Sequence, residues 1–504
     1  MKKKRSAHGW TVLSLTLCLL AGEPQIFLLT VALLALFAFF LPRREQRLDL
    51  SFGVKSLGMI VLFVLAALLV AAAQLGPAFA DYTLSIRTEG FTFQEAARFS
   101  LQPSMLKHLL LPLVFPPHFE TDPNFFARFY PTSSGTPWLL TLYPGSLIVP
   151  LAALSLLSGS RKRVLLWLMV FVVSLALALG ENAPLFRFFY KVLPAFRFPE
   201  KFIFPAAFSL LLMAAHGFEG LLSRFEKRKG IANLLFLGLF VFLVLDLFWA
   251  HRNLNPVREF AFYQAYDPRL ETINLGILHG LHHVDGVTGL ELRYQYLITE
   301  LLSRPWPERI RFLKLVNVKY IISRQSLDEH NDLLDHVERI NPLVFRIKNP
   351  LPRAWMVAQV LPLHKGSVEE LLKPSFDPWS QVIAGGVLPK LSEPGFFNEV
   401  DALRYEQDGR IRITVTADRP SVLVLSESSY PGWRVFVNGQ EKECLWLNLL
   451  FQGVELPSGR NEILFEFRPQ RFSGYAAVSL VSLAFLWIVF FSSLSWTKRR
   501  PMHP

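Results

Sequence analysis

The chain has 504 residues, of which 52% are hydrophobic and 45 are phenylalanine. This composition excludes an ordinary soluble protein, and the length predicts several domains. The net charge of +12 does not indicate nucleic-acid binding, because five short segments beside apolar runs hold 18 Lys and Arg residues against three acidic ones. These are residues 2–5, 43–55, 161–163, 224–229 and 498–500. They account for +15 and leave −3 for the remainder, so the basic charge is a signal of membrane topology.

Eight apolar segments are candidates for membrane spans, since crossing a bilayer takes ~17–25 mostly apolar residues. In chain order they are residues 10–20, 26–41, 55–74, 143–158, 164–180, 202–223, 231–249 and 474–491. The first two are short and form a hairpin around the polar loop 21–25, and Pro77 is expected to end the third. With a cytoplasmic amino terminus, every basic segment falls on the cytoplasmic side. The segments 77–141, 181–200 and 251–473 then lie outside.

The composition after residue 250 is that of a water-facing region. Helical patterns cover residues 294–302 and 328–340, while residues 316–322 and 355–360 are predicted strands, the first of them buried. Residues 403–467 contain about seven short strands with regularly spaced turns, which is typical of a β-sandwich. Two hairpins are predicted there, one turning at Asn438-Gly439 and the other at residues 457–459.

The predicted fold class is therefore mixed: a polytopic α-helical membrane domain of about eight spans, with an extracytoplasmic α/β and β-sandwich region. We expect a multi-span membrane domain at residues 1–250 and an extracytoplasmic α/β domain at 251–400. A β-sandwich at 401–473 and a C-terminal transmembrane helix with a basic tail at 474–504 complete the chain.

The sequence shows no phosphate-binding glycine loop, HExxH pattern or nucleophile elbow. The tract HGLHHVD at residues 279–285 resembles a metal site, but its flanking glycines favour a loop, so no metal site is predicted. Cys18 and Cys444 are not expected to pair, and Cys444 is interpreted as a small buried residue rather than a nucleophile. His216, Glu219 and Asp246 lie near the ends of predicted spans, where either function or simple contact with the membrane surface explains them.

Charged residues of the outer loops are the better candidates for a site. A transferase with a phosphate-linked lipid donor needs a carboxylate to accept a proton from the acceptor hydroxyl, and cations to hold the donor phosphate. The candidate catalytic carboxylates are Asp81, Glu120 and Asp122, and the candidate substrate-binding residues are Arg87, Glu181, Arg197, Glu200 and Lys201. Glu23 and Glu89 belong to the same group of loop charges. The alternative for each residue is a solvated loop charge or a headgroup anchor.

Arg197 and Lys201 are expected to lie near one another at the outer membrane surface, in a groove that holds a lipid phosphate. The reason is their alternation with Phe196, Phe198 and Phe202, which would fix the segment at headgroup depth.

Several blocks, in their order along the chain, resemble the YfhO-type bacterial membrane proteins. The most specific block is residues 428–467, which contains YPGWRVFVNG and LFQGVELPSGRNEILFEF. The other blocks are residues 21–25, 74–87, 193–202, 246–256, 285–294, 317–322 and 351–354. The resemblance implies a relative of the GT-C glycosyltransferases, which use polyprenyl-phosphate sugars at the outer face of the membrane. It further implies a bacterial plasma (inner) membrane location and transfer of a sugar to a cell-envelope glycan, with membrane lipid and no nucleic acid as a partner.

The chain departs from that family pattern in one respect. GT-C proteins are expected to carry a catalytic acid in the first long outer loop, and here the first outer loop is only residues 21–25. The chain is then a truncated or split member whose missing amino-terminal spans come from a partner, or it has lost activity, or Glu23 or a residue of the 77–141 loop substitutes. A chain without its general base is expected to be weakly active, since that group typically contributes ~10²–10⁴-fold in rate.

Two other functions remain open. One is a non-catalytic envelope scaffold whose β domain binds a polysaccharide or a partner enzyme. The other is a lipid or glycan transporter, which the small number of intramembrane charges supports poorly.

Overall fold

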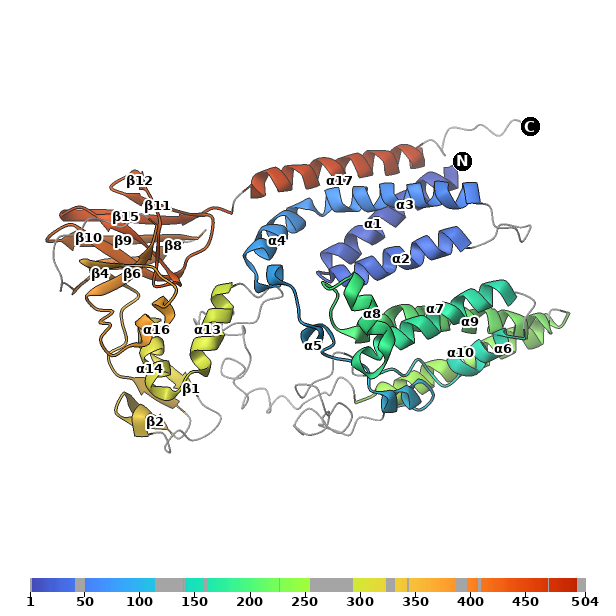
Figure 1. The fold of residues 1–504 in the computed structure, drawn as a ribbon. Coiled ribbons are helices and arrows are strands. Elements are labelled where there is room, and N and C mark those ends of the chain that lie inside the picture. Colours follow the sequence, from blue (N-terminus) through green and yellow to red (C-terminus); the bar gives the residue numbers. More distant parts are fainter. Residues whose placement is uncertain are drawn as a thin grey trace. The chain divides into compact units, whose positions relative to one another are not determined.

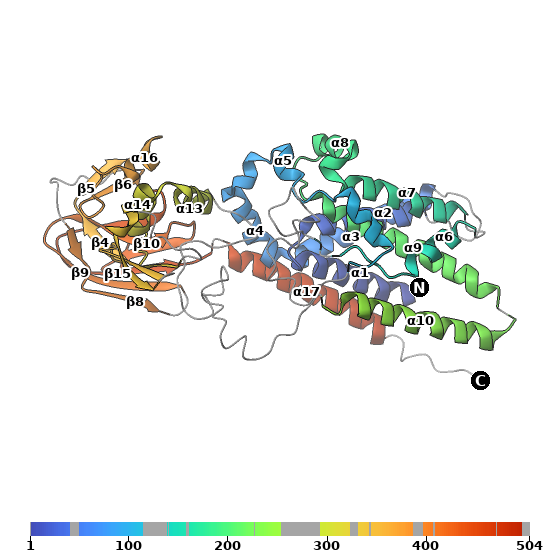
Figure 2. The same ribbon diagram turned by 90° about the horizontal axis from the view of Figure 1, so that it is seen from below.

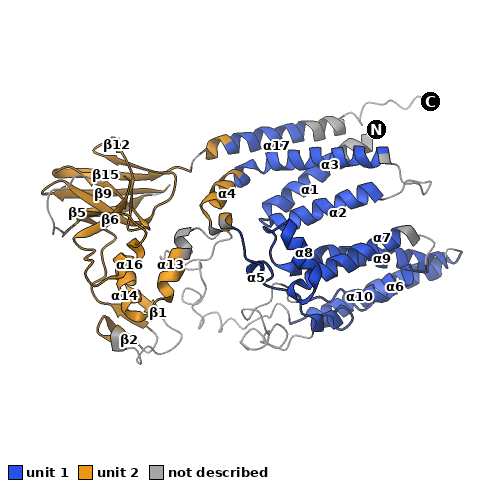
Figure 3. Cartoon of the chain, viewed as in Figure 1, with its two compact units in different colours: residues 1–75, 89–263, 475–504 blue, residues 76–88, 264–474 orange. Residues whose placement is uncertain are grey.

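The structure is a computed structural model that describes residues 2–40, 50–113, 139, 141–157, 161–225, 227–253, 293–322, 331–341, 344–386, 397–406, 409–469 and 471–495. These residues form two compact units (Figure 3). Unit 1 comprises residues 1–75, 89–263 and 475–504, and unit 2 comprises residues 76–88 and 264–474.

Unit 1 is helical. Its longer helices are α1 (Lys2–Leu20), α2 (Pro24–Phe40), α3 (Leu50–Val70), α7 (Arg161–Ala178), α9 (Ile203–Ser223), α10 (Lys229–His251) and α17 (Phe472–Ser495). Its short helices are α5 (Phe93–Ala96), η2 (Pro103–Leu109), α6 (Ile148–Ser155), η5 (Gly180–Asn182), α8 (Pro184–Val192) and η6 (Pro199–Phe202). Helices α1 and α2 pack against α3, and α6 and α7 pack against α9 (Figure 1). Gly217 permits the close approach of α9 to α6, because a Cβ atom there would lie 1.8 Å from the carbonyl oxygen of Leu151.

Three helical stretches of the described residues are long and apolar enough to cross a membrane: Ser51–Val70, Pro199–Ser223 and Lys229–His251. The apolar helices Ala7–Leu20, Pro24–Phe40, Arg163–Ala178 and Phe472–Ile488 are shorter. In the described part of the predicted span 143–158, the helix α6 has 8 residues. These extend ~12 Å, against a hydrocarbon core of ~30 Å.

The expectation that Pro77 ends the third span is wrong. Helix α4 (Ala72–Leu84) begins almost where α3 ends and contains Pro77. Ala71 N donates to Ala67 O and Leu75 N donates to Ala71 O, so helical hydrogen bonds continue across the junction. Pro77 removes one donor, and the remaining bonds of α4 carry the helix on to Leu84.

Unit 2 is built around a β-sandwich. Its larger sheet has the strand order β5 (Gln359–Pro362), β6 (Gln381–Gly385), β13 (Leu445–Leu447), β14 (Phe451–Leu456), β10 (Ser421–Ser428), β4 (Ala354–Val357) and β7 (Phe397–Glu399). The smaller sheet has the order β12 (Gln440–Lys442), β11 (Trp433–Val437), β15 (Gly459–Phe467), β9 (Arg410–Ala417) and β8 (Ala402–Glu406). Between them, Ile413 and Phe465 of the smaller sheet pack with Leu423 and Val454 of the larger one.

The larger sheet is covered on both faces. Helices α13 (Arg293–Ser303), α14 (Trp306–Leu315) and α16 (Ser367–Leu372) contribute to the core on the face away from the smaller sheet (Figure 2). Val422 and Val424 of β10 point to that helical layer, while Leu423 and Leu425 point into the sandwich. All four are fully buried, which explains why β10 is a continuous apolar run rather than an alternating one.

The predicted boundary at residue 401 cuts across this sheet. Strands β4 to β7 come from the region expected to be a separate α/β domain, yet they share a sheet with β10, β13 and β14. Residues 354–399 and 421–456 therefore belong to one folding unit.

Other local predictions have mixed outcomes. The helix at 294–302 is confirmed by α13. The single strand predicted at 355–360 is instead two strands, because β4 ends at Val357 and pairs with β10 and β7, whereas β5 begins at Gln359 and pairs with β6. The helix predicted at 328–340 is wrong over its second half, because β2 (Val337–Asn341) pairs with β3 (Val344–Ile347); its first half is α15 (Asn331–Leu334) within the described residues. The strand predicted at 316–322 is only β1 (Tyr320–Ile322), and its Tyr320 is 50% exposed rather than buried.

The turn at Asn438-Gly439 is confirmed. It joins β11 to β12 with Val437 paired to Gln440, and both turn residues have positive φ (50° and 79°). The second predicted hairpin is wrong. Residues 457–459 connect β14 to β15, but these strands lie in different sheets, so the bend is a corner of the sandwich.

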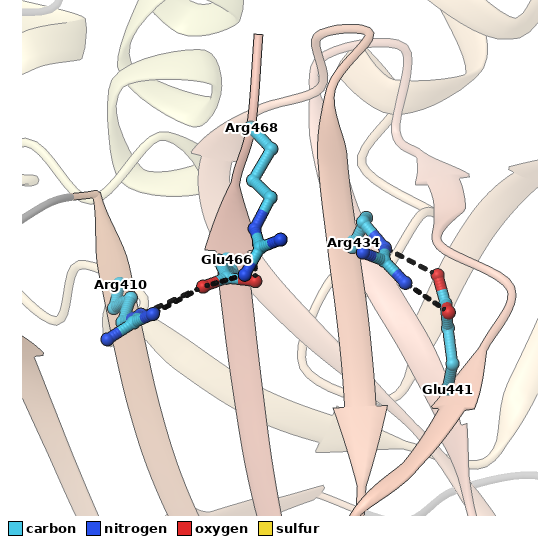
Figure 4. A network of polar contacts seen from close by, with 5 residues as sticks. All are labelled: Arg410, Arg434, Glu441, Glu466 and Arg468. Atoms are coloured by element: carbon cyan, nitrogen blue, oxygen red, sulfur yellow. Dashed lines mark hydrogen bonds and ion pairs between the residues drawn. The ribbon is translucent and has the colours of Figure 1, made fainter. Parts of the chain in front are cut away.

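Ion pairs join neighbouring strands of the smaller sheet (Figure 4). Glu466 on β15 receives Arg410 Nη2 from β9 at 2.7 Å and Arg468 Nε at 2.8 Å. Arg434 Nε on β11 donates to Glu441 Oε1 on β12 at 2.7 Å. The Arg410–Glu466 pair thus joins β9 to β15, and the Arg434–Glu441 pair joins β11 to β12.

Candidate functional site

Predicted site residues gather in unit 1 where α9 begins. Lys201 Nζ donates to Glu23 Oε1 at 2.7 Å and to Gln25 Oε1 at 2.8 Å. The Lys201 side chain is 4% exposed and that of Glu23 is 38% exposed. The pair is thus a buried ammonium group held by a carboxylate that reaches the surface of unit 1. We call Glu23, Gln25, Arg197 and Lys201 the α9 cluster.

The ring of Phe198 joins the two cations of the α9 cluster. The Arg197 guanidinium carbon lies 3.9 Å from its centroid and Lys201 Nζ lies 5.1 Å from it. Arg197 also lies over Phe91, at 4.9 Å. The structure therefore brings Arg197 and Lys201 together on the ring of Phe198.

A strained backbone presents these cations. Phe198 has φ 65° and ψ 80°, a left-handed conformation that costs on the order of 1–3 kcal/mol for a residue with a bulky side chain. The conformation is held by Phe198 N, which donates to Ala96 O at 2.9 Å. Ala96 lies on α5, whose start is fixed by a capping box between Thr92 and Glu95. The Thr92 hydrogen bonds hold the Glu95 pKa below its usual value, and Arg197 adds to that effect.

Glu200 and Glu181 lie against the chain that follows α5. Glu200 is fully buried, and its Oε2 accepts from Leu139 N at 3.2 Å. Glu181 is exposed, and its backbone N–H donates to Ser100 Oγ at 2.9 Å. The packing is close at this point, because a Cβ atom on Gly180 would lie 2.0 Å from Ser100 Oγ. Glu200 is thus buried and accepts a backbone hydrogen bond from Leu139.

Asp81 and Arg87 belong to unit 2. The Tyr430 hydroxyl donates to Asp81 Oδ1, and burial raises the pKa of this carboxyl. Arg87 follows α4, where its backbone N–H donates to Ser85 Oγ at 2.9 Å. Asp81 is therefore engaged in anchoring α4 to the loop after β10. Glu120 and Asp122 lie outside the described residues.

Asp246 has a structural explanation. Its carboxylate accepts from Tyr143 Oη at 2.8 and 2.9 Å, from Ser146 N at 2.8 Å and from Ser146 Oγ at 3.1 Å. These bonds satisfy donors just before α6 begins. The residues Tyr-Pro-Gly-Ser before an apolar run were a signal for this helix start, but nothing local identified Asp246 as their partner.

Gln25 is the member of the α9 cluster that sequence reasoning missed. It is 176 positions from Lys201, and its Nε2 also donates to Ala195 O at 3.2 Å. The loop 21–25 thereby fastens to the segment before α9 at two points.

The described residues contain no group of three or more His, Cys, Asp or Glu side chains arranged to hold a metal ion. The tract 279–285 lies outside them. Cys444 packs against the sandwich core, where burial raises its pKa to about 11, consistent with a structural thiol.

Comparisons of the sequence with known protein families and with curated proteins, and a search of solved structures, give no match.

Proposed function

We propose that the chain is a membrane protein that acts on a polyprenyl-phosphate-linked sugar, transferring the sugar, or helping to transfer it, to a cell-envelope glycan. The observation that carries the proposal is the α9 cluster. It combines two neighbouring cations with a partly exposed carboxylate at the start of a stretch long enough to cross a membrane. Such a stretch starts at the membrane surface, where a lipid phosphate lies.

The proposed role of each charged residue in the α9 cluster follows from how far its side chain is exposed. Arg197 is partly exposed and is the cation for the donor phosphate, since a guanidinium offers paired donors to a phosphate. Lys201 is buried and fixes Glu23. Glu23 is bonded to Lys201 and reaches the surface, so it is the first candidate to accept the proton of the acceptor hydroxyl. Glu120 and Asp122 remain candidates for the same role.

Binding of polyprenyl phosphate to the full chain in nanodiscs tests the donor site. Arg197→Gln is expected to weaken binding about tenfold or more, because a charge-assisted bond to phosphate contributes roughly 1.5–3 kcal/mol. Arg98→Gln is the matched control, since Arg98 also lies over an aromatic ring, that of Phe99, at 5.3 Å. Equal losses in the two variants would show general electrostatic attraction and overturn the assignment.

Turnover by the purified chain with lipid-linked sugars and envelope acceptors tests the carboxylate. Glu23→Gln is expected to lower any turnover by about 10²-fold or more. Turnover that survives in Glu23→Gln and is lost in Asp122→Asn would move the role to the 77–141 loop.

The proposal includes a topology with residues 251–473 outside. In a Cys18→Ala background, a membrane-impermeant maleimide applied to intact cells should label Gln440→Cys and not Arg228→Cys. The reverse pattern would invert the topology.

A non-catalytic scaffold that binds a glycan is the second candidate, and the engagement of Asp81 by Tyr430 favours it. This candidate predicts glycan binding by the full chain without turnover, and with no effect of Glu23→Gln on that binding.

A further inference from the structure

The surface of helix α8 has three parts: a buried apolar face, an exposed apolar strip and a basic edge. Phe186 is fully buried, and Phe189 and Tyr190 are partly buried in the same core. Leu185, Phe188 and Val192 are 37%, 63% and 77% exposed. At about 100° of rotation per residue these three exposed side chains share a sector of about 60°. The helix therefore has one apolar face packed on unit 1 and a second apolar face that no described residue covers.

Two cations border the uncovered face. Arg187 and Lys191 are one turn apart, and both are exposed. The Arg187 guanidinium carbon lies 5.0 Å from the Phe93 centroid, and Lys191 Nζ lies 5.8 Å from the Phe188 centroid. The sequence of α8 contains no acidic residue. The exposed part of the helix is thus an apolar strip with a positively charged edge.

We propose that α8 lies in the plane of the membrane interface, with Leu185, Phe188 and Val192 among the upper acyl chains. Arg187 and Lys191 then contact the phosphates of anionic lipids. The inference rests on the membrane placement in the proposed function, but it requires neither sugar transfer nor the α9 cluster.

The position of α8 in the chain favours a lipid surface, rather than a protein partner, as the cover of its exposed apolar strip. It follows α7 through η5 and precedes η6 and α9, so it connects the ends of two apolar helices. A short helix at such a connection meets the membrane surface when its neighbours cross the bilayer. An exposed apolar strip beside basic residues is the pattern of helices that lie in the interface, and each such cation favours anionic lipid about fivefold.

The experiment places an environment-sensitive fluorophore on single cysteines of the full chain, in a Cys18→Ala, Cys444→Ala background in liposomes. Labels at Phe188→Cys and Val192→Cys should show blue-shifted emission and quenching by shallow spin-labelled lipids. A label at Leu237→Cys, which is 56% exposed in the middle of α10, should be quenched by deeply spin-labelled lipids.

The Leu237 label separates the possible failures. Quenching at position 237 with water-like emission at 188 and 192 overturns the α8 proposal alone. Water-like emission at all three positions removes the membrane placement as well, and the α8 proposal falls with it.

The anionic preference is measured as the ratio of quenching by spin-labelled phosphatidylglycerol to that by spin-labelled phosphatidylcholine at position 188. Arg187→Gln with Lys191→Gln should lower this preference by about fivefold per cation. Arg187→Lys with Lys191→Arg should retain it. An unchanged preference in the neutral double variant would overturn the headgroup contact.

Discussion

Helix α10 and strand β10 are both strongly apolar, yet their side chains have opposite exposures. In β10, Val422, Leu423, Val424 and Leu425 are all fully buried. In α10, Leu234 is 72% exposed and Phe248 is 73% exposed. Exposing apolar surface to water costs roughly 25 cal/mol per Å², so the exposures in α10 require an apolar surrounding. The comparison teaches that the apolar side chains of β10 are covered by their own unit, whereas the exposed ones of α10 need lipid or another protein to cover them.

Replacing one phenylalanine in each unit tests this difference in exposure, and it has the largest expected effect. Phe465→Ala opens a cavity in the sandwich, where the ring is fully buried, and should destabilise unit 2 by about 3–5 kcal/mol. Phe248→Ala should change stability in a bilayer by only about 0.5 kcal/mol. Pulse proteolysis of the reconstituted protein in urea measures both, and a large loss from Phe248→Ala would mean that protein rather than lipid covers α10.

Substitutions in the Lys201–Glu23 pair compare the stability cost of an unpaired buried charge with that of an unpaired exposed charge. Glu23→Ala leaves the buried ammonium without its carboxylate and should cost about 3 kcal/mol. Lys201→Met leaves Glu23, which is 38% exposed and can be hydrated, so this variant should be the milder one. Thermal unfolding in detergent orders the variants. The exposed pair Arg434–Glu441 is the control, and its loss should have no measurable effect. A milder Glu23→Ala would contradict the burial argument.

These examples show which parts of the structure local sequence predicts. The Asn438-Gly439 turn was predictable because its two residues favour positive φ wherever they occur. The corner at residues 457–459 was not, because β15 pairs with β9 and β11 rather than with the preceding β14. The partnership of Lys201 with Glu23 was equally hidden, since 178 positions separate them. The sequence identified their charge and loop location, but long-range packing decides which charges meet.

Lowering the pH should destabilise the smaller sheet, because protonation of Glu466 removes its ion pairs. Hydrogen bonds from Arg410 and Arg468 hold the pKa of Glu466 below its usual value of 4.5. Because the folded pKa is the lower one, the pair stabilises the fold at neutral pH, and this contribution is lost as pH falls below about 4.5 toward the folded pKa. The stability difference between the natural chain and Glu466→Gln should shrink between pH 7 and pH 3. A constant difference over that range would contradict the role of this ion pair.

The prediction with the smallest expected effect concerns the rate at which Cys444 reacts with a maleimide. Because burial raises its pKa to about 11, its thiolate is scarce at pH 8, and reaction with a maleimide in a Cys18→Ala background should be slow. Unfolding returns the pKa toward roughly 8.5 and should accelerate the reaction by about two orders of magnitude. Rapid labelling of the folded protein would show that the sandwich core opens at this point.

The position of β15 in its sheet has a consequence for synthesis of the chain. It is the last strand in sequence, yet it lies in the middle of the smaller sheet, between β11 and β9. Neither neighbour has its full set of strand partners until residue 467 has left the ribosome, and α17 begins only five residues later. The smaller sheet is therefore completed only when α17 is already being synthesised. Until then the earlier strands have unpaired edges, which are vulnerable to aggregation.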